Sequence, residues 1–242
     1  MCLPEGFRVA HFFLQWYSSF MKEEKIDYQK QLTQIILQVQ KLPVKPKLLL
    51  HACCAPCSSY VIEYLSVFFD ITIYYFNPNI HPQSEYERRL EELKVFLSKF
   101  PLALQNSVKL EVAEYNPEIF FDAVKTREQP ELQEEPERGE RCRRCYEFRM
   151  KKAFEFAVNN KYDYFTTTLS ISPYKDAVKI NTIGYTFDNL SDVKYLPADF
   201  KKKNGFLRSL QLSSEYGLYR QDYCGCVYSM RSKHDNSKQT DS

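Results

Sequence analysis

The chain has 242 residues, of which 44% are hydrophobic and 26% are charged, a composition that predicts a globular protein with a sizeable core. Its formal net charge of +2, from 33 basic and 31 acidic residues, does not by itself indicate nucleic-acid binding. The eight cysteines fall in tight groups in a chain without a convincing export signal, so we expect a reducing cytoplasm and metal-binding or redox-active thiols rather than a secreted disulfide framework.

The first predicted region is a helical amino-terminal extension over residues 1–46. Residues 10–20 are partly apolar, but this stretch is too short to span a bilayer, and no membrane association is expected. Residues 26–40 carry apolar side chains at helical spacing before two prolines, which predicts a packing helix without a chemical role. Met21 opens the charged run MKEEK, so translation starting at Met21 instead of Met1 is a hypothesis that the intact mass would test.

Residues 47–230 are predicted to form a metal-binding α/β catalytic domain. Short apolar runs alternate with amphipathic segments, which is typical of a Rossmann-like fold with a largely parallel sheet and flanking helices. The predicted strands cover residues 48–51, 71–76, 108–115, 162–169 and 193–196. The predicted helices cover residues 58–69, 85–100, 117–125 and 141–159, with two more within 170–184 and 201–226.

Two segments are predicted to lack regular structure. Residues 128–140, with the sequence EQPELQEEPERGE, are acidic and contain prolines, which favours a solvated surface loop over a binding role. Residues 231–242 are polar and of low complexity, and we expect this tail to be disordered.

Three cysteines follow the first predicted strand in the sequence HACCAPC. Cys53 and Cys54 fall at the carboxyl end of that strand, and Cys57 opens the next helix. Ligands of open α/β sheets bind at this edge, where helix amino termini point inward. Because neighbouring cysteines rarely bond to each other, we expect separate roles for them or a shared metal.

A second pair, Cys142 and Cys145, lies in a predicted helix, where a spacing of three places both thiols on nearly the same face. Such a CxxC pair can be redox-active or half of a zinc or iron–sulfur site. With Cys53 and Cys54 it completes a four-thiolate set that suits tetrahedral zinc or a cubane cluster. The long separation between the two pairs favours the iron–sulfur site, and zinc stays the alternative.

A third pair, Cys224 and Cys226, flanks Gly225. Two thiols at this spacing can form a small, strained disulfide of the labile, redox-active kind. They could equally be ligands of a second metal together with Asp222 or Cys57. The residues alone leave both interpretations open.

Other polar residues complete the predicted site. Lys175, in SPYKD at the carboxyl edge of a predicted strand, is a candidate proton donor or phosphate contact. His51 and His81 are as well explained by structural roles. Tyrosines interleaved with basic residues suit the stacking of unpaired RNA bases, although a solvated charged face is an equal alternative. The basic residues concerned are Arg141, Arg143, Arg144, Arg149, Lys201, Lys202, Lys203, Arg208 and Arg220.

Four motifs, HACCAPCSSYVIEYL, RCRRCYEFRM, TTTLSISPYKD and NGFLRSLQLSSEYGLYRQDYCGC, together resemble the epoxyqueuosine reductase QueH family across residues 47–230. The resemblance implies the reduction of epoxyqueuosine to queuosine at the wobble position of tRNA, the last step of queuosine biosynthesis. It implies a 4Fe-4S cluster, and a further metal, an additional iron ion, beside it. Reduction also requires an external electron donor.

The resemblance assigns roles to individual cysteines. The cluster ligands it implies are Cys53, Cys54, Cys142 and Cys145. Cys224 and Cys226 would match the redox-active pair of the family. Cys57 and Asp222 are candidates for the further metal, and Asp222 and Lys175 join the redox pair as candidate catalytic residues.

Two other functions share parts of this pattern. A zinc-stabilised RNA-binding protein without catalysis would use the same four thiolates, but it predicts a colourless protein in which Cys224 and Cys226 have no role. A cluster-dependent tRNA thiolation enzyme would need a glycine-rich ATP-binding loop after the first strand, where this chain has HACCAPC.

Overall fold

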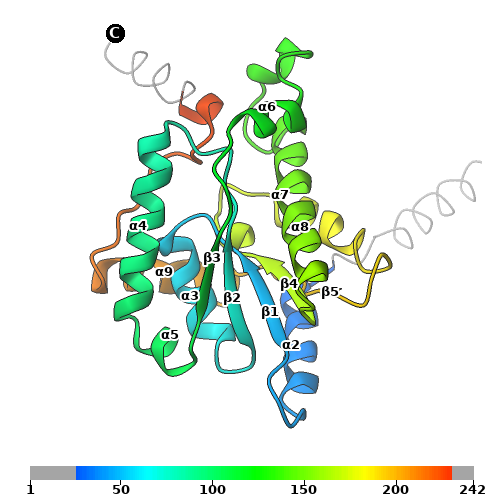
Figure 1. Cartoon of the computed structure of the whole chain (residues 1–242), viewed down its shortest axis with the longest axis vertical. Helices are drawn as coiled ribbons and strands as arrows, with labels where there is room; N and C mark the ends of the chain where they lie inside the picture. The colour runs from blue at the N-terminus through cyan, green and yellow to red at the C-terminus, as the bar shows by residue number, and fades with distance from the viewer. Residues whose placement is uncertain (1–25, 231–242) are drawn as a thin grey trace, which may run out of the picture.

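The computed structural model describes residues 26–230 and contains a five-stranded parallel sheet flanked by helices, in the strand order β3-β2-β1-β4-β5 (Figure 1). The strands are β1 (Lys47–His51), β2 (Asp70–Tyr75), β3 (Lys109–Val112), β4 (Tyr164–Thr167) and β5 (Lys194–Tyr195). This confirms the predicted α/β class and parallel sheet. The predictions about Met1, Met21 and the tail after residue 230 lie outside the described residues.

Eight α-helices and two short 3-10 helices connect the strands within the described residues. The α-helices are α2 (Tyr28–Val39), α3 (Ala55–Leu65), α4 (Gln83–Lys99), α5 (Pro101–Gln105), α6 (Glu118–Val124), α7 (Glu140–Asn159), α8 (Ala177–Tyr185) and α9 (Gly205–Glu215). The 3-10 helices are η1 (Pro130–Gln133) and η2 (Thr168–Ile171). None of the helices described between residues 26 and 230 is long and apolar enough to cross a bilayer.

Both faces of the sheet are buried at the central strands β1 and β2, whereas the edge strand β3 has no buried residue. In β1, Leu48 and Leu50 belong to a core shared with α3 and α4, whereas Leu49 belongs to a second core shared with α7 and α8. Figure 1 shows these helices on opposite sides of the sheet. Because successive side chains of a strand point to opposite faces, a strand covered on both sides reads as a continuous apolar run. This explains the sequence KLLLH of β1.

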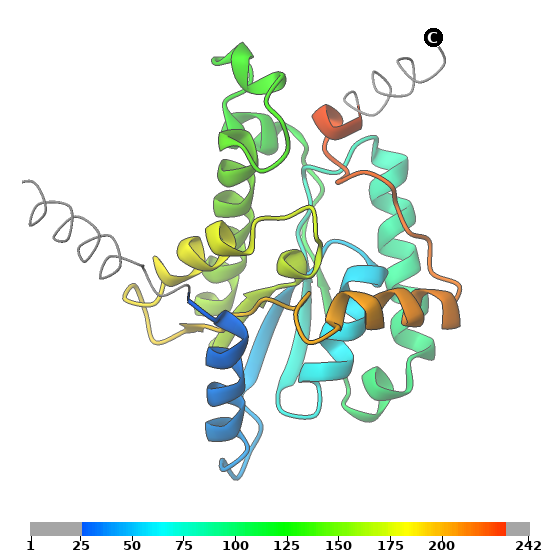
Figure 2. The ribbon, with the colours of Figure 1, turned by 180° about the vertical axis from the view of Figure 1, so that it is seen from behind.

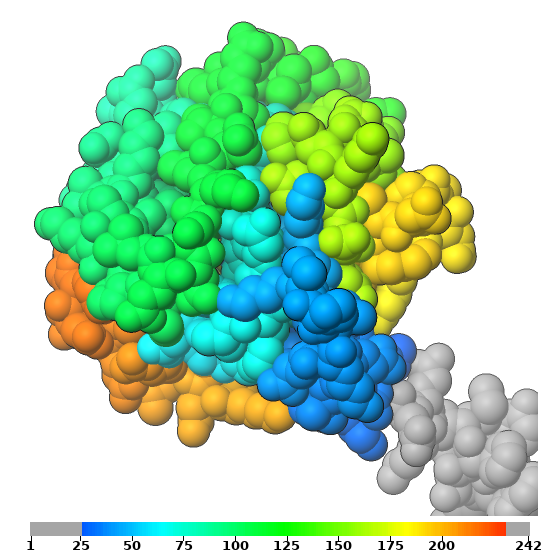
Figure 3. Space-filling view, turned by 60° about the horizontal axis from the view of Figure 1, so that its bottom comes forward, coloured from blue at the N-terminus to red at the C-terminus, as the bar shows by residue number. Residues whose placement is uncertain are grey.

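The helix α2 packs as predicted. Asp27 caps its amino terminus by accepting hydrogen bonds from the backbone amides of Gln29 and Lys30. Its buried face, including Leu32 and Ile36, joins the core beside α3. The Tyr185 hydroxyl of α8 donates to Gln31 at 2.7 Å, and α2 lies beside α8 in Figure 2 and over part of the bottom of the molecule in Figure 3.

Several element boundaries differ from the predicted ones. The helix α3 begins at Ala55, three residues earlier than expected, because Pro56 occupies its first turn. The strand β4 ends at Thr167, whose hydroxyl accepts from the Leu169 amide and starts the turn η2. Both differences bring polar or thiol side chains closer to the carboxyl edge of the sheet.

Gly205, the first residue of α9, lies where no side chain fits: a Cβ there would collide with the carbonyl oxygen of Phe200 and the ring of Tyr60. Since a backbone carbonyl cannot move aside, we expect Gly205→Ala to lower the free energy of unfolding in urea by roughly 2 to 3 kcal/mol. The matched control is Gly217→Ala, which meets nothing within 4 Å but has a φ of +62°. It should cost only about 1 kcal/mol, and equal losses in both variants would contradict this explanation.

Candidate active site

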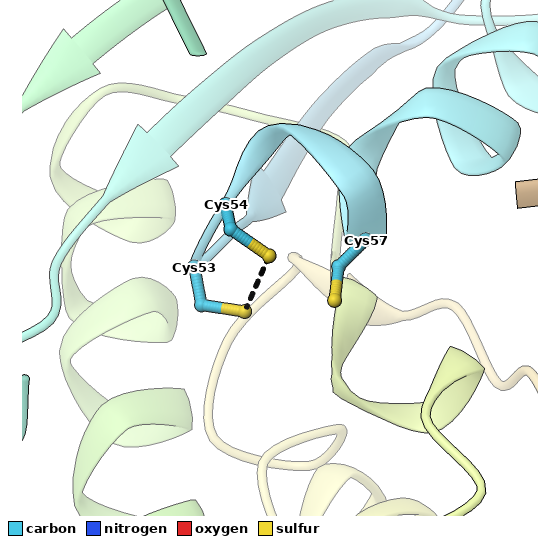
Figure 4. A group of neighbouring side chains, drawn as sticks. All are labelled: Cys53, Cys54 and Cys57. Carbon is cyan, nitrogen blue, oxygen red and sulfur yellow. Dashed lines mark hydrogen bonds between the residues drawn. The ribbon is translucent and has the colours of Figure 1, made fainter. Parts of the chain in front are cut away.

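The first group of thiols surrounds the turn between β1 and α3. Cys53 and Cys54 follow the strand, and Cys57 lies in the first helical turn. The three sulfur atoms lie within 4.8 Å of one another, and the Sγ atoms of Cys53 and Cys54 are 3.7 Å apart (Figure 4). We call Cys53, Cys54 and Cys57 the three-thiol group. Thiols this close can share one metal ion.

Hydrogen bonds couple the ionisation of the three thiols in this group. Hydrogen bonds from the thiols of Cys54 and Cys57, helped by nearby Arg149 and Arg89, hold the pKa of Cys53 well below its usual range. The hydrogen bond with Cys53 raises the pKa of Cys54 to about 12, and the pKa of Cys57 also rises for this reason. A bound metal would displace the remaining protons, since thiolates rather than thiols are the ligands.

The CxxC pair lies on α7, outside the three-thiol group. Cys145 is buried and packs in a small apolar cluster that includes Cys226 and the half-buried Cys224. Electrostatic contact between Arg149 and both Cys53 and Cys145 links α7 to the three-thiol group. A cubane cluster binds each cysteine through a different iron, so it joins thiols that are farther apart than the ligands of a single ion.

The Tyr146 hydroxyl and the Arg149 Nε are two of the three buried polar atoms of α7 that have no hydrogen-bond partner among the described residues; the third is the Arg141 Nε. Arg149 is 1% exposed and donates through Nη2 to Asn77 at 2.5 Å. Electrostatic interaction joins both Tyr146 and Arg149 to Cys145. Buried polar atoms without partners are costly, and a buried guanidinium beside Cys53 and Cys145 would offset the negative charge of metal-bound thiolates. These residues therefore fit an anionic metal–thiolate group.

Cys224 and Cys226 are free thiols in two different environments. Cys224 accepts a hydrogen bond from the Lys175 ammonium at 2.7 Å. Cys226 is buried, which raises its pKa to about 12. Between them Gly225 has a φ of +99°, and a Cβ there would stand 2.9 Å from Ile80, so the turn requires glycine. The His81 amide donates to the Gly225 carbonyl at 2.8 Å.

Lys175 is almost fully buried and keeps its charge. Burial by itself would lower the pKa of this ammonium, but the neighbouring Cys224 sulfur, with Tyr146 and Glu137, raises that pKa well above its usual value. Lys175 therefore presents a charged hydrogen-bond donor beside Cys224.

Arg89 of α4 anchors the segment that carries Cys224. Its Nη1 donates to the Cys224 carbonyl at 3.3 Å and its Nη2 to the Tyr223 carbonyl at 3.5 Å. Its Nε pairs with Glu85 at 2.6 Å, and these side chains are 0% and 10% exposed. A buried pair of this kind fixes geometry because neither partner can be left alone at low cost.

We expect Arg89→Met to lower the free energy of unfolding by about 3 kcal/mol, because Glu85 stays buried without its partner. The control is Arg127→Met, which breaks the pair of Arg127 with Glu118, whose side chains are 54% and 62% exposed. That change should cost less than about 1 kcal/mol. Urea unfolding measures both values, and a loss for Arg89→Met no greater than the control would contradict the anchoring role.

A cavity of about 530 Å³ opens in front of these groups. Cys53, Cys57 and Cys224 line it together with Lys175 and Asp222. Asp222 is not part of the three-thiol group. Apolar and aromatic side chains form much of the remaining wall, among them Leu169, Ile171, Pro173, Tyr174, Phe206, Leu210 and Tyr223. The volume suits a small-molecule or nucleoside ligand.

Other residues singled out from the sequence have structural roles. His51 is fully buried, accepts from the Thr167 hydroxyl at 2.8 Å and donates to the Phe76 carbonyl at 3.1 Å. Burial lowers its pKa to about 3, so the ring is neutral. The ring of His81 packs beside Phe121, with centroids 5.2 Å apart. Neither histidine lines the cavity.

The arginines beside the CxxC pair are largely engaged inside the protein. Arg141 donates to the carbonyl oxygens of Leu132, Gln133 and Glu135, and Arg143 and Arg144 both pair with Glu140. The sequence pattern groups Arg149 with these residues as a candidate nucleic-acid contact, whereas in the structure Arg149 interacts with Cys53 and Cys145. Its position one helical turn after Cys145 could have indicated this contact.

Two residues that contact the cysteine segments could not be identified from the sequence, namely Arg89 and Gln221. Arg89 lies in an ordinary amphipathic helix far from any cysteine motif. The Gln221 amide donates to the Cys54 sulfur at 3.1 Å, which joins the segment before Cys224 to the three-thiol group.

Comparisons with known proteins agree with the resemblance predicted from the motifs. The family model described as "Epoxyqueuosine reductase QueH" matches residues 48–232. A relative with this name from Staphylococcus epidermidis is 44% identical over 219 residues, which cover 90% of this chain and 91% of the relative. One from Streptococcus pyogenes is 43% identical over 208 residues, covering 86% and 80%. One from Thermotoga maritima is 34% identical over 195 residues, covering 77% and 93%. The chain therefore belongs to the epoxyqueuosine reductase QueH family.

Proposed function

We propose that this chain is a cytoplasmic enzyme that reduces epoxyqueuosine to queuosine at the wobble position of tRNA, with residues 47–230 as its catalytic unit. A 4Fe-4S cluster would be held by Cys53, Cys54, Cys142 and Cys145. Cys57 would take part in binding an additional iron ion, with Asp222 on the same cavity wall. Membership of the family supports the reaction.

The observation that carries this proposal is that two of the three cysteine groups line one cavity and the third is packed next to them. Cys53, Cys57 and Cys224 line the cavity, and Cys145 and Cys226 share one apolar cluster with Cys224. These residues come from the turn after β1, from α7 and from the segment after α9, which are distant in the sequence. Such an arrangement brings electron-transfer groups and a substrate pocket together at the carboxyl edge of a parallel sheet.

The redox balance of the reaction matches these groups. Converting the epoxide to an alkene breaks two C–O bonds, releases the oxygen as water and consumes two electrons and two protons. Oxidation of the Cys224 and Cys226 thiols to a disulfide supplies two electrons and two protons. An external reductant of the dithiol class would then restore both thiols. When bound, the cluster supplies a one-electron carrier between the dithiol and the substrate.

Lys175 is suited to deliver a proton to the leaving oxygen. Lys175 lines the cavity, its Nζ atom donates to the Cys224 sulfur, and its raised pKa keeps the ammonium protonated at neutral pH. The oxygen becomes basic as its C–O bonds break, which favours transfer from a positioned ammonium. The Cys224 sulfur holds the Lys175 ammonium in place until the substrate enters.

Metal analysis distinguishes this proposal from a zinc-stabilised RNA-binding protein. Protein purified without oxygen should contain iron and acid-labile sulfide in cubane proportion and absorb visible light. Stoichiometric zinc in a colourless sample that forms no cluster on reconstitution would contradict the proposal. Cluster-dependent tRNA thiolation is disfavoured, because the turn after β1 carries cysteines in place of a glycine-rich phosphate loop.

A further inference from the structure

The acidic loop, residues 128–140, is solvated over most of its length, with only Leu132 buried, but it also reaches the cavity. Glu137 forms part of the cavity wall. The next residue, Arg138, donates to the backbone carbonyls of Tyr174 and Pro173, and Lys179 donates to the Arg138 carbonyl at 2.5 Å. The loop is therefore fastened to the same segment that carries Lys175, with Glu137 held at the cavity.

The carboxylate of Glu137 interacts with the described part of the protein through longer-range electrostatics. Among residues 26–230 no hydrogen bond or ion pair within 4.0 Å engages it, and its electrostatic neighbour is Lys175, whose ammonium is already bonded to Cys224. By contrast, Glu135 in the same loop accepts from the Arg141 amide at 2.8 Å and has a structural role. Glu137 is the carboxylate of this loop that faces the cavity.

A carboxylate in a pocket for RNA repels the negative phosphates of the RNA and attracts a positively charged group of the ligand. Epoxyqueuosine supplies one. A secondary amine links its deazaguanine base to the epoxide ring, and an aliphatic amine of this type is protonated at neutral pH. Unmodified guanine has no such cation.

We propose that Glu137 is a specificity-determining residue that binds the secondary ammonium of the substrate side arm. This inference rests on the proposed function and deepens it. The ammonium donates a charge-assisted hydrogen bond to the Glu137 carboxylate, while the aromatic side chains of the cavity, such as Phe206 and Tyr223, offer surfaces for the rings. Asp222, the second carboxylate of the cavity, stays with the metal and the chemistry.

The test compares Glu137→Gln with Glu134→Gln in the full chain loaded with its cluster. Glu134 belongs to the same loop and is exposed, and it does not line the cavity, so both variants change the net charge equally. We expect Glu137→Gln to raise KM for tRNA that carries epoxyqueuosine about tenfold, with the loss falling on KM rather than kcat. Glu134→Gln should behave as the wild type.

Binding measurements separate this inference from the proposed function. The Kd of the wild-type protein for tRNA carrying epoxyqueuosine should be about tenfold lower than its Kd for the same tRNA carrying guanine. Glu137→Gln should abolish that preference without weakening binding of the guanine form. A preference unchanged in Glu137→Gln, or lost equally in Glu134→Gln, would overturn the inference. A wild-type protein that keeps the preference but shows no turnover would refute the proposed function and leave the role of Glu137 standing.

Discussion

Replacing either Cys224 or Cys226 with serine is expected to lower the rate of epoxyqueuosine reduction by roughly 100-fold or more, while the iron and sulfide contents stay at the wild-type level. A disulfide needs both sulfur atoms, so each single variant removes the two-electron store. Cys224 lies at the cavity beside Lys175, and Cys226 lies behind it, buried. Neither belongs to the four thiols assigned to the cluster.

The measurement is steady-state queuosine formation with an external dithiol reductant, followed by mass spectrometry of the digested tRNA. The control is Cys2→Ser, which removes a cysteine to which no role is assigned. Full turnover by Cys224→Ser or Cys226→Ser with the cluster intact would show that the dithiol role is wrong.

Cys53→Ser and Cys142→Ser are expected to abolish both the visible absorption and the activity. Each removes one of four thiolates from a site where the substitute hydroxyl is a poor ligand for iron. Iron and sulfide should fall together in both variants, although the two residues lie on different elements, the turn after β1 and the helix α7. Loss of metal from only one of the two variants would show that the two cysteine pairs do not bind one shared cluster.

Cys57→Ser is the matched comparison, because Cys57 lies within 4.8 Å of the Cys53 and Cys54 sulfurs but is not assigned to the cluster. This variant should lose iron without losing sulfide, as expected of a ligand to a separate iron ion. Equal loss of iron and sulfide would instead make Cys57 a cluster ligand. A colourless wild-type protein with bound zinc would contradict both assignments.

The sheet could be predicted from the sequence because its central strands, β1 and β2, are rich in apolar residues and buried. A run such as Leu48 to Leu50, buried on both faces, reads as a strand without any knowledge of its neighbours. Cysteines after such a run fall at the carboxyl edge of the sheet, where parallel folds place their ligands. The three-thiol group is therefore the part of the site that can be predicted from the local sequence pattern.

The rest of the site depends on contacts between distant segments. Arg89 and Cys224 are brought together by the packing of α4 against the segment after α9, and no periodicity in either segment indicates this. The composition of the acidic loop predicts a solvated loop, but it does not predict that Arg138 donates to the Tyr174 carbonyl or that Glu137 lines the cavity. The composition of a loop indicates how well it is solvated, but it does not indicate which part of a cavity wall the loop forms.

The most direct test of the account is a reaction of the reduced, cluster-loaded protein with tRNA that carries epoxyqueuosine, carried out without oxygen. Mass spectrometry of the digested tRNA should show queuosine formed in proportion to the enzyme in a single turnover, and continued formation when a dithiol reductant is supplied. Binding of the tRNA with no conversion, by protein that contains its full iron and sulfide, would contradict the assignment of this site as a reductase.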